Sequence, residues 1–182
     1  MSARNTVTYR LDEGGLLVEC GGAWDEFARA NGGADVTEAR ILGRPIWDFV
    51  AGSSTRQLWH ELLDAARERG GVVIPFRCDA PDRRRYMVMT IEPQTDGTLL
   101  LASAVAREER RPRQRWLDYD AGRSDETVVI VSCSWCRRFL VEDEWLEVEN
   151  AVARSGLLEG ATPLISHGVC PACAETLMAQ LA

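Results

Sequence analysis

The sequence Ser132-Cys-Ser-Trp-Cys136 and the later sequence Cys170-Pro-Ala-Cys173 supply two separate cysteine pairs. Each pair offers two thiolates from one tight turn, and two such pairs are what a tetrahedral metal site requires. The pattern therefore predicts a Zn²⁺ site within a C-terminal module of residues 127–182. Its four expected ligands are Cys133, Cys136, Cys170 and Cys173.

The predicted role of this site is structural. Four thiolates fill the tetrahedron and leave no position for a catalytic water. A module this small, with few large apolar residues, buries too little apolar surface to be stable alone and needs a cross-link such as a bound metal. Pro171 suits the first position of a helix, which would place Cys173 in a first turn whose free amides donate to sulfur. His167 has two open roles, as a metal ligand in place of one cysteine or as a donor to a sulfur.

Composition and charge restrict the class of protein. The 182 residues carry a net charge of −7, with 46% hydrophobic and 27% charged residues, which is typical of a globular protein. No apolar run approaches the ~20 residues of a membrane span, and no secretory signal follows the N-terminus. We therefore expect a cytoplasmic protein, where thiols stay reduced. Residues 127–182 hold three arginines against seven acids, so we expect no nucleic-acid binding.

The first hundred residues alternate between strand and helix patterns. The periodicity predicts two strands, several short helical segments, one long helix capped by Ser53 or Ser54, and three further strands. This order predicts an α+β domain with a five-stranded antiparallel sheet and its helices on one side. The predicted strands are 6–11, 16–20, 72–78, 84–92 and 99–106, and the predicted helical segments are 23–30, 37–41, 46–50 and 55–69.

Residues 5–106 resemble a PAS domain of bacterial signalling proteins. The resemblance rests on the order of elements and on four stretches: Trp24-Asp-Glu-Phe-Ala-Arg-Ala-Asn-Gly32, Leu42-Gly-Arg-Pro-Ile-Trp-Asp-Phe-Val50, Pro75-Phe-Arg-Cys-Asp79 and Arg84-Arg-Tyr-Met87. It implies a sensory or protein-interaction module, often dimeric, with a ligand cavity between sheet and helices. The C-terminal module resembles a treble clef or zinc ribbon, and the cysteine-rich tails of some bacterial PAS and histidine-kinase proteins.

The resemblance raises the question of a cofactor, but it does not identify the PAS ligand, which is unknown. Flavin-binding light sensors of the family carry an Asn-Cys-Arg-Phe motif that this sequence lacks. Haem-binding members use a histidine near the long helix, but helical geometry predicts that His60 faces solvent. Cys20 and Cys78 are expected to be small buried hydrophobic residues in strands. The run Arg83-Arg-Arg85 is interpreted as a solvated hairpin tip, with docking of an acidic partner as the alternative.

Residues 107–126 are highly charged and are interpreted as a solvated linker between the two parts. Phosphate loops, nucleophile elbows and metalloprotease motifs do not occur in the sequence, so we do not expect an enzyme. The expected function is signalling, with a PAS-like sensing or interaction domain coupled to a structural zinc docking module. Its expected partners are a protein, either a second copy or another chain, and a small molecule, without a membrane. The alternatives are a haem- or flavin-binding redox or gas sensor, and a thiol switch that releases zinc.

Overall fold

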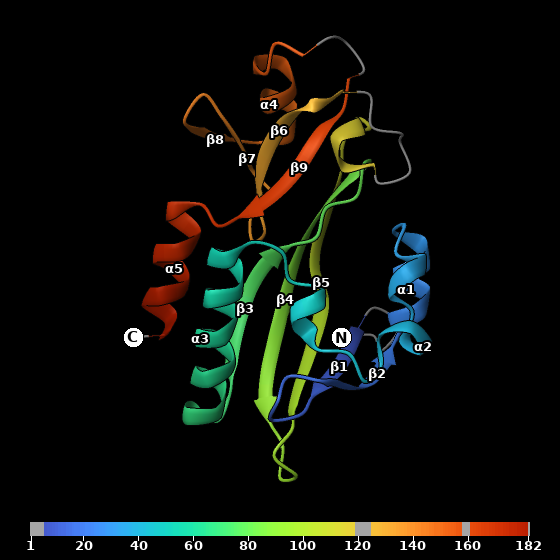
Figure 1. Cartoon of the computed structure of the whole chain (residues 1–182), viewed down its shortest axis with the longest axis vertical. Coiled ribbons are helices and arrows are strands. Elements are labelled where there is room, and N and C mark those ends of the chain that lie inside the picture. Colours follow the sequence, from blue (N-terminus) through green and yellow to red (C-terminus); the bar gives the residue numbers. More distant parts are fainter. Residues whose placement is uncertain (1–5, 119–124, 158–160, 182) are drawn as a thin grey trace.

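A five-stranded antiparallel sheet forms the larger part of the computed structural model, which describes residues 6–118, 125–157 and 161–181 (Figure 1). The strand order is β2-β1-β5-β4-β3. The strands are β1 (Thr6–Leu11), β2 (Leu17–Gly22), β3 (Val72–Arg77), β4 (Arg83–Pro93) and β5 (Leu99–Arg110). Most predicted strand boundaries fall within two residues of these, because alternating apolar residues mark the buried face of each strand.

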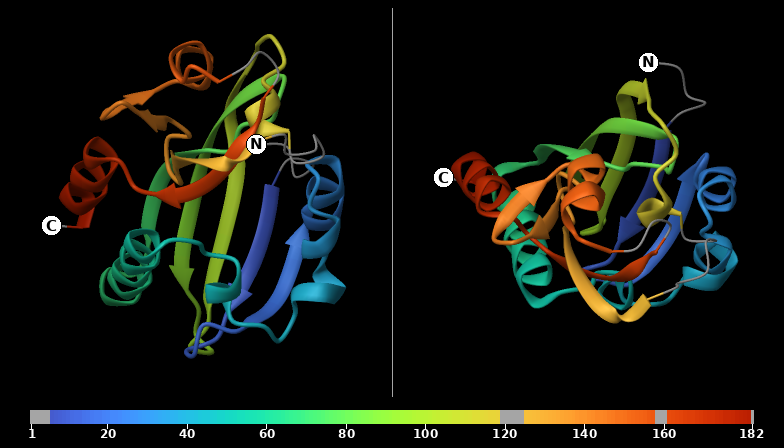
Figure 2. Two further views of the ribbon diagram at one scale, coloured as in Figure 1. Left: turned by 45° about the horizontal axis from the view of Figure 1, so that its top comes forward. Right: turned by 90° about the horizontal axis from the view of Figure 1, so that it is seen from above.

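All helices between β2 and β3 lie on one side of this sheet, as the right-hand view of Figure 2 shows. They are α1 (Trp24–Ala30), α2 (Glu38–Ile41) and α3 (Ser53–Arg69), with the short 3-10 turns η2 (Ala34–Val36) and η3 (Ile46–Asp48). The expected α+β class, with a PAS-like five-stranded sheet and helices on one side, is confirmed.

The core lies between α3 and the inner face of the sheet. Leu62 of α3, Ile91 of β4 and Leu101 of β5 are each at most 1% exposed. These positions follow the periods of their elements, 3.6 residues in the helix and two in the strands. The same core extends to Cys133, Trp135 and Cys170, so the cysteine-bearing part packs against the PAS-like part.

Glycine sets both ends of α3. Gly70 ends the helix in the left-handed conformation, with φ 78°, which glycine adopts without a steric penalty. The predicted serine cap is wrong, because the N-cap is Gly52 and no side chain caps the helix. Gly52 has φ 85°, and a Cβ there would lie 2.5 Å from the carbonyl oxygen of His167. A glycine is therefore needed where the start of α3 approaches the C-terminal part.

A second, four-stranded sheet has the order β8-β7-β6-β9 and lies over one end of the first (Figure 1). Its strands are β6 (Asp125–Cys133), β7 (Phe139–Val141), β8 (Glu144–Leu146) and β9 (Pro163–Gly168). Strand β9 pairs in parallel with β6, and α4 (Val148–Arg154) follows β8. Helix α5 (Pro171–Leu181) leaves this sheet and lies beside α3. The last helix was expected, whereas β7 and β9 were not.

The interpretation of residues 107–126 as a solvated linker is wrong where the structure describes them. Strand β5 continues to Arg110, and the side chain of Arg111 is only 5% exposed. The 3-10 helix η4 (Arg115–Leu117) then places Trp116 and Leu117 in a second core with β7 and α4. Arg111 pairs with Asp79 at 3.3 Å and with Glu149 of α4 at 3.7 Å, so its charge is balanced inside the protein. The division of the chain into 5–106, 107–126 and 127–182 stays a prediction.

Substitution of Leu62 by alanine tests the core between α3 and the sheet. Removing a buried leucine side chain leaves a cavity and is expected to lower the free energy of unfolding by about 2–5 kcal/mol. Urea unfolding followed by circular dichroism measures this loss. The matched control is Val73→Ala in β3, where the side chain is 62% exposed and the expected change is within about 0.5 kcal/mol. Equal losses in the two variants would contradict this description of the core.

Candidate metal centre and adjoining cavities

The four predicted ligands come from two turns that the fold brings together. Cys133 ends β6, and its N–H donates to the carbonyl of Arg138 at 2.7 Å, which closes a tight turn that we call the cysteine knuckle (residues 133–138). Cys170 directly precedes α5, and Cys173 lies in its first turn, as the position of Pro171 predicts. The tight turn and the proline at the helix start are local features, which is why the sequence indicated them.

The geometry of the four sulfurs fits a tetrahedral metal site. Their Sγ atoms all lie within 4.8 Å of one another, and those of Cys136 and Cys170 are 3.7 Å apart. A tetrahedron with metal–sulfur bonds of about 2.3 Å requires sulfur–sulfur distances of about 3.8 Å. The N–H groups of Cys170 and Cys173 point at Cys133 Sγ and Cys170 Sγ, both at 3.4 Å. Such donors stabilise thiolate ligands, as expected from the helix start.

The electrostatics of the cluster favour a cation. Hydrogen bonds from the Cys136 and Cys173 thiols lower the pKa of Cys133, so this group ionises first. Its hydrogen bond and negative charge then raise the pKa of Cys136 to about 12, and that of Cys173 rises for the same reason. Like charges this close oppose one another, and a bound metal ion relieves that repulsion. The donor set can therefore hold a metal ion.

His167 lies in β9 and is not brought into the cluster. Among the described residues, the cluster of potential metal ligands contains the four cysteines and no other side chain. His167 is half-buried and borders a cavity instead. Burial lowers its pKa, and the positive charge of Arg137 lowers it further. The structure thus gives no support to His167 as a replacement ligand.

The cysteine knuckle is seated directly on the PAS-like part. The N–H of Arg77, at the end of β3, donates to the carbonyl of Trp135 at 2.7 Å. The Trp135 ring is 6% exposed and lies 6.0 Å from the Trp59 ring of α3. The hydroxyls of Thr55 and Ser134 are 3.2 Å apart, within hydrogen-bond distance. Backbone, aromatic and hydroxyl contacts thus fix the knuckle against α3 and β3.

Ion pairs hold the remainder of the interface. The side chain of Asp79 is 1% exposed and pairs with Arg77 and with Arg111, the latter at 3.3 Å. Arg77 also donates to Glu147 at 2.8 Å, and Arg84 donates to Glu149 at 2.9 Å. The interpretation of Arg83-Arg-Arg85 as a solvated turn is wrong, because these residues begin β4. The alternative was docking of an acidic partner. An acidic residue of the same chain takes that place, because Arg84 contacts Glu149 of α4. No local pattern indicated these pairs.

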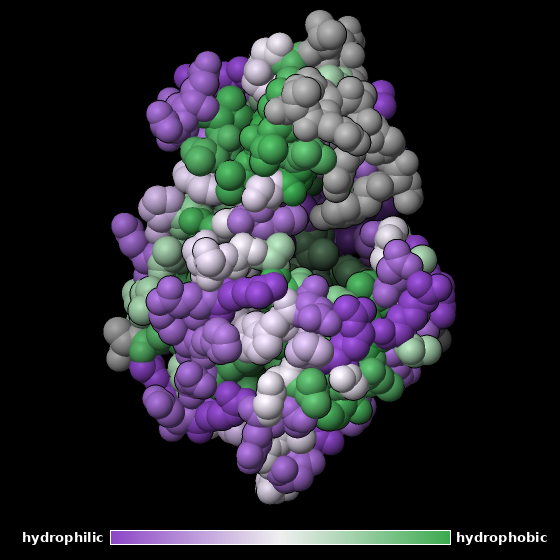
Figure 3. Space-filling model, in the orientation of Figure 1, coloured by the Kyte–Doolittle hydropathy of each residue, from purple (hydrophilic) through white to green (hydrophobic). Residues whose placement is uncertain are grey.

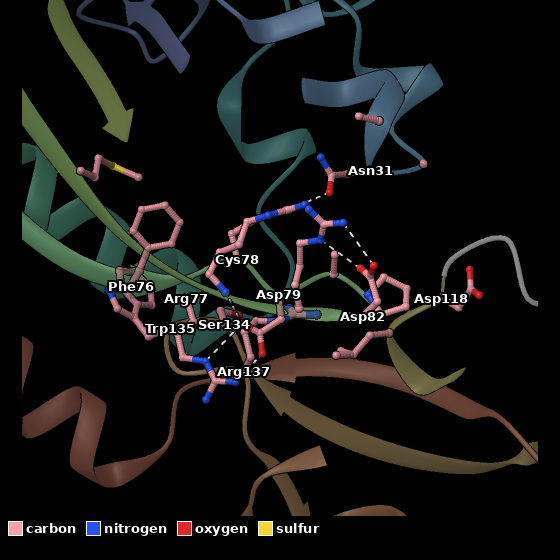
Figure 4. A pocket seen from close by; sticks show the side chains of 18 of the residues that line it. Asn31, Phe76, Arg77, Cys78, Asp79, Asp82, Asp118, Ser134, Trp135 and Arg137 are labelled. Atoms are coloured by element: carbon pink, nitrogen blue, oxygen red, sulfur yellow. Dashed lines mark hydrogen bonds and ion pairs between the residues drawn. The ribbon is translucent and has the colours of Figure 1, made fainter. Parts of the chain in front are cut away.

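A cavity of about 630 Å³ lies where the cysteine knuckle meets the sheet. Phe76 and Trp135 lie together on one side of it, with Asn31 and Asp118 across from them (Figure 4). Figure 3 shows the molecular surface hollowed at the level where the two parts meet. The sequence did not indicate this cavity, because its walls come from segments far apart in the chain.

A second cavity, of about 430 Å³, lies between β1, β2 and the helices that cover them. Tyr9, Trp24 and Phe49 are among its lining residues, and so is His167. It corresponds to the cavity between sheet and helices that the PAS resemblance implies. Trp59, Ser134 and Arg137 border both cavities, so the cysteine knuckle takes part in each.

The other candidate residues from the sequence, His60, Cys20 and Cys78, lie apart from the cysteine cluster. His60 is exposed, as predicted, and its ring stacks on Trp47 at 3.9 Å. Cys20 is buried in β2, as expected, and burial raises its pKa to about 11. Cys78 follows β3 rather than lying in it, and it borders the larger cavity. Burial raises the pKa of this thiol, so it is held in the neutral form.

Similar solved structures are PAS domains or contain a related light-sensing domain. The PAS domain of the Cronobacter turicensis quorum-sensing receptor RpfR, in complex with C12:0, is 11% identical, with 59% of this chain and 99% of that chain covered and a TM-score of 0.43. The PAS domain of Bordetella pertussis BvgS is 18% identical, with coverages of 56% and 72% and a TM-score of 0.39. An RNA-binding Light-Oxygen-Voltage receptor is 21% identical, with coverages of 56% and 28% and a TM-score of 0.35.

No protein-family model and no curated protein sequence matches the chain. The PAS-like fold assignment rests on the strand order and helix placement of residues 6–110. Within the described ranges, no helix combines the length and apolar character needed to cross a membrane.

Substitution of Asp79 by asparagine tests the buried ion pairs. It leaves the buried charges of Arg77 and Arg111 without their common partner, and we expect a loss of about 3–5 kcal/mol in the free energy of unfolding. The control is Asp35→Asn, whose carboxylate pairs with Arg40 but is 92% exposed. That change should cost less than about 1 kcal/mol. Thermal and urea unfolding of both variants measure the difference, and a small loss in Asp79→Asn would contradict this role.

The Arg77–Glu147 contact predicts a pH dependence. Burial alone raises the pKa of Glu147, but hydrogen bonding and charge from Arg77 outweigh it, so the pKa lies below its ordinary value. The stabilisation is therefore fully present above the unfolded pKa of about 4.3 and is lost as pH falls through the folded pKa. In urea unfolding, the free energy of unfolding should fall less between neutral and acid pH for Glu147→Gln than for the unsubstituted chain. Glu26→Gln, at an exposed position, is the control and should show the same fall in the free energy of unfolding as the unsubstituted chain. Any part of that fall due to release of a metal at acid pH is common to both variants.

Proposed function

We propose that this chain is a non-enzymatic, cytoplasmic signalling protein in which a PAS-like sensing or interaction domain is coupled to a structural zinc module. The observation that carries the proposal is the cysteine knuckle, which contains Cys133 and Cys136 of the sulfur cluster and also packs on α3 and β3. A change at either part is therefore transmitted to the other through packed side chains rather than through a flexible linker.

Zinc is the proposed metal because four cysteines at tetrahedral spacing are its preferred structural ligands. Cys133 and Cys136 would hold it from the knuckle, and Cys170 and Cys173 from the start of α5. When bound, zinc supplies a four-way cross-link and neutralises thiolate charge. With four sulfur ligands the proposed site has no position for substrate, which supports a structural role.

The proposed output is a contact with a partner protein or a second copy of this chain. The PAS-like architecture supports a sensing role, and the zinc module offers a second surface for docking. The stimulus is proposed to be a small molecule bound in one of the two cavities, which have volumes of about 630 and 430 Å³. Both are large enough for a small organic ligand.

The rival functions make different predictions for the purified protein. A haem or flavin sensor would absorb between roughly 350 and 450 nm, where a zinc–thiolate centre does not. A thiol switch would release zinc on treatment with peroxide, whereas a purely structural centre would keep its zinc content unchanged.

Elemental analysis of the full chain tests the metal centre. We expect about one zinc per chain, and Cys133→Ser should remove most of it because one of four ligands is lost. Cys78→Ser is the matched control, since this thiol lies outside the cluster and should leave the zinc content unchanged. Purified protein without zinc, or full zinc content in Cys133→Ser, would contradict the proposal.

The same variants test how far the two parts fold together. The sequence alone suggests that loss of the metal would unfold only residues 127–182. Because Cys133, Trp135 and Cys170 share a core with Leu62, we expect Cys133→Ser to destabilise the PAS-like part as well. A calorimetric scan should show one transition moved to lower temperature, rather than one transition lost and another retained.

A further inference from the structure

The larger cavity, of about 630 Å³, is not enclosed by the PAS-like segment alone. The sheet supplies Ile74 and Phe76, and the cysteine knuckle supplies Ser134 and Trp135. Leu117, from the 3-10 turn η4, adds a further part of the wall. Residues 5–106 by themselves would leave this space open on the side of the knuckle. The cavity is therefore a property of the assembled chain, and it differs from a cavity confined between sheet and helices.

The apolar part of the lining favours a flat molecule. It contains three large aromatic side chains and three other apolar ones, namely Trp59, Phe76 and Trp135 with Ile74, Met89 and Leu117. The rings of Trp59 and Trp135 lie 6.0 Å apart, and Figure 4 shows Phe76 and Trp135 together on one side of the space. Aromatic walls of this kind pack well against a flat apolar body.

The charged side chains of the lining all have partners, which disfavours an ion as the ligand. Three pairs lie within the lining itself, namely Arg77–Asp79, Arg83–Asp82 and Arg113–Asp118. Arg85 donates to Asn31 at 2.7 Å and pairs with Glu108 at 3.3 Å, and Arg137 is not without a partner either. An ionised ligand would lose its hydration without meeting a free counter-charge, so a neutral ligand is favoured.

One hydroxyl proton at the cysteine knuckle has no acceptor among the described residues. Ser134 and Thr55 each carry one O–H proton, and the single hydrogen bond between their oxygens, of 3.2 Å, uses only one of the two. Either oxygen can be the donor, so Thr55 can donate to Ser134 and leave the Ser134 proton unused. Ser134 borders the larger cavity whereas Thr55 does not. A ligand acceptor in this cavity would pair the unused proton.

The same turn holds a second donor without an acceptor. Trp135 is 6% exposed, and within the described part of the chain its indole N–H has no hydrogen-bond partner. Trp135 borders the larger cavity and also a smaller one, of about 240 Å³, beside α5. Buried polar groups are normally hydrogen-bonded, and an unpaired one costs free energy. The excess at this wall of the cavity is thus of donors, which favours a ligand that brings an acceptor.

We propose that the larger cavity binds a neutral, flat, apolar molecule that carries a hydrogen-bond acceptor such as a carbonyl oxygen, and that Ser134 donates to this acceptor. The inference rests on the proposed function and deepens it, because it names the class of the small molecule. Ser134 stands between the proposed metal ligands Cys133 and Cys136, so the metal holds the turn that presents its hydroxyl. Ligand and metal therefore strengthen each other's binding by the same factor.

The test uses the full zinc-loaded chain and three fluorescent probes. Propionyl-dimethylaminonaphthalene is neutral and flat and carries a carbonyl, dimethylaminonaphthalene lacks the carbonyl, and anilinonaphthalene sulfonate carries a negative charge. Fluorescence titration should show saturable binding of the propionyl probe at one site per chain, at least about tenfold tighter than binding of the sulfonate. Equal or tighter binding of the sulfonate in competition with the propionyl probe would contradict the preference for a neutral ligand.

Substitution of Ser134 by alanine tests the hydrogen bond. Ser134→Ala should weaken the propionyl probe by about two- to tenfold and leave dimethylaminonaphthalene unchanged, since only the donor is removed. The emission of the bound propionyl probe should also move to shorter wavelength, because its carbonyl no longer accepts a hydrogen bond. The matched control is Ser54→Ala, at an exposed serine outside both linings, which should change neither the affinity nor the emission. Unchanged affinity and emission in Ser134→Ala would overturn the contact.

Nuclear magnetic resonance locates the probe without any substitution. Isotope-filtered spectra of the complex should show contacts between the propionyl probe and Ile74 and Leu117, which border only the larger cavity of the two. Contacts to Tyr9 and Phe49 instead would place the probe in the smaller cavity between sheet and helices and would overturn the proposed site. Zinc content and near-ultraviolet circular dichroism equal to those of the unsubstituted chain verify that Ser134→Ala is folded.

Zinc titration tests the linkage between ligand and metal. The propionyl probe should raise the apparent zinc affinity of the full chain by the same factor by which zinc raises the affinity for the probe. If zinc is present but the probe binds elsewhere or ignores Ser134→Ala, this inference fails and the proposed zinc module stands. If the purified chain holds no zinc, the zinc module and the linkage fail, whereas probe binding to the same chain still decides the ligand class.

Discussion

The convergence of four sulfur atoms at one point is the constraint on which this structure depends. The turn after β6 and the start of α5 are separated in sequence by three strands and a helix, yet their thiols lie within 4.8 Å of one another. Thiols at this spacing oppose each other's ionisation, so the arrangement favours a cation. Because Cys133 and Cys170 are also buried in the core beneath α3, the same centre fixes how the second sheet meets the first. The cysteine cluster and the hydrophobic packing are therefore not separable in this chain.

Charge complementarity completes the contact between the two parts. The acids that make residues 127–182 negative are partly directed inward, where Glu147 and Glu149 meet arginines of β3, β4 and the segment after β5. An ion pair with little exposure contributes little net stability when both members are present. Removal of one member is destabilising, because the other charge is left without a partner. They favour one orientation of the second sheet over others. Helix α5 beside α3 and the close approach at Gly52 restrict the orientation further.

Much of the fold was predictable, because its information is local. Alternation marked the strands of the first sheet, helical periodicity marked α3, and Pro171 indicated the helix that carries Cys173. The failures share one physical cause. Arg83 to Arg85 and residues 107–118 are rich in charge, and charge in a sequence normally indicates solvent. Here Arg84 and Arg111 are balanced by Glu149, which is distant in sequence, and no local pattern indicates such a pairing. Strand β7 has only three residues, and β9 shows no clear alternation of buried and exposed positions, so neither was predicted.

By itself, the sequence determined the α+β class, the order of the PAS-like elements and the identity of the four clustered cysteines. These follow from periodicity, turn residues and ligand spacing, all of which act over a few neighbouring residues. Only the tertiary structure decided that the cysteine knuckle is seated on α3 and β3, that the side chains of Arg111, Trp116 and Leu117 after β5 are buried, and that two cavities share Trp59, Ser134 and Arg137. Such features depend on which surfaces meet after the local elements have formed, and on the burial and charge balance that each contact achieves.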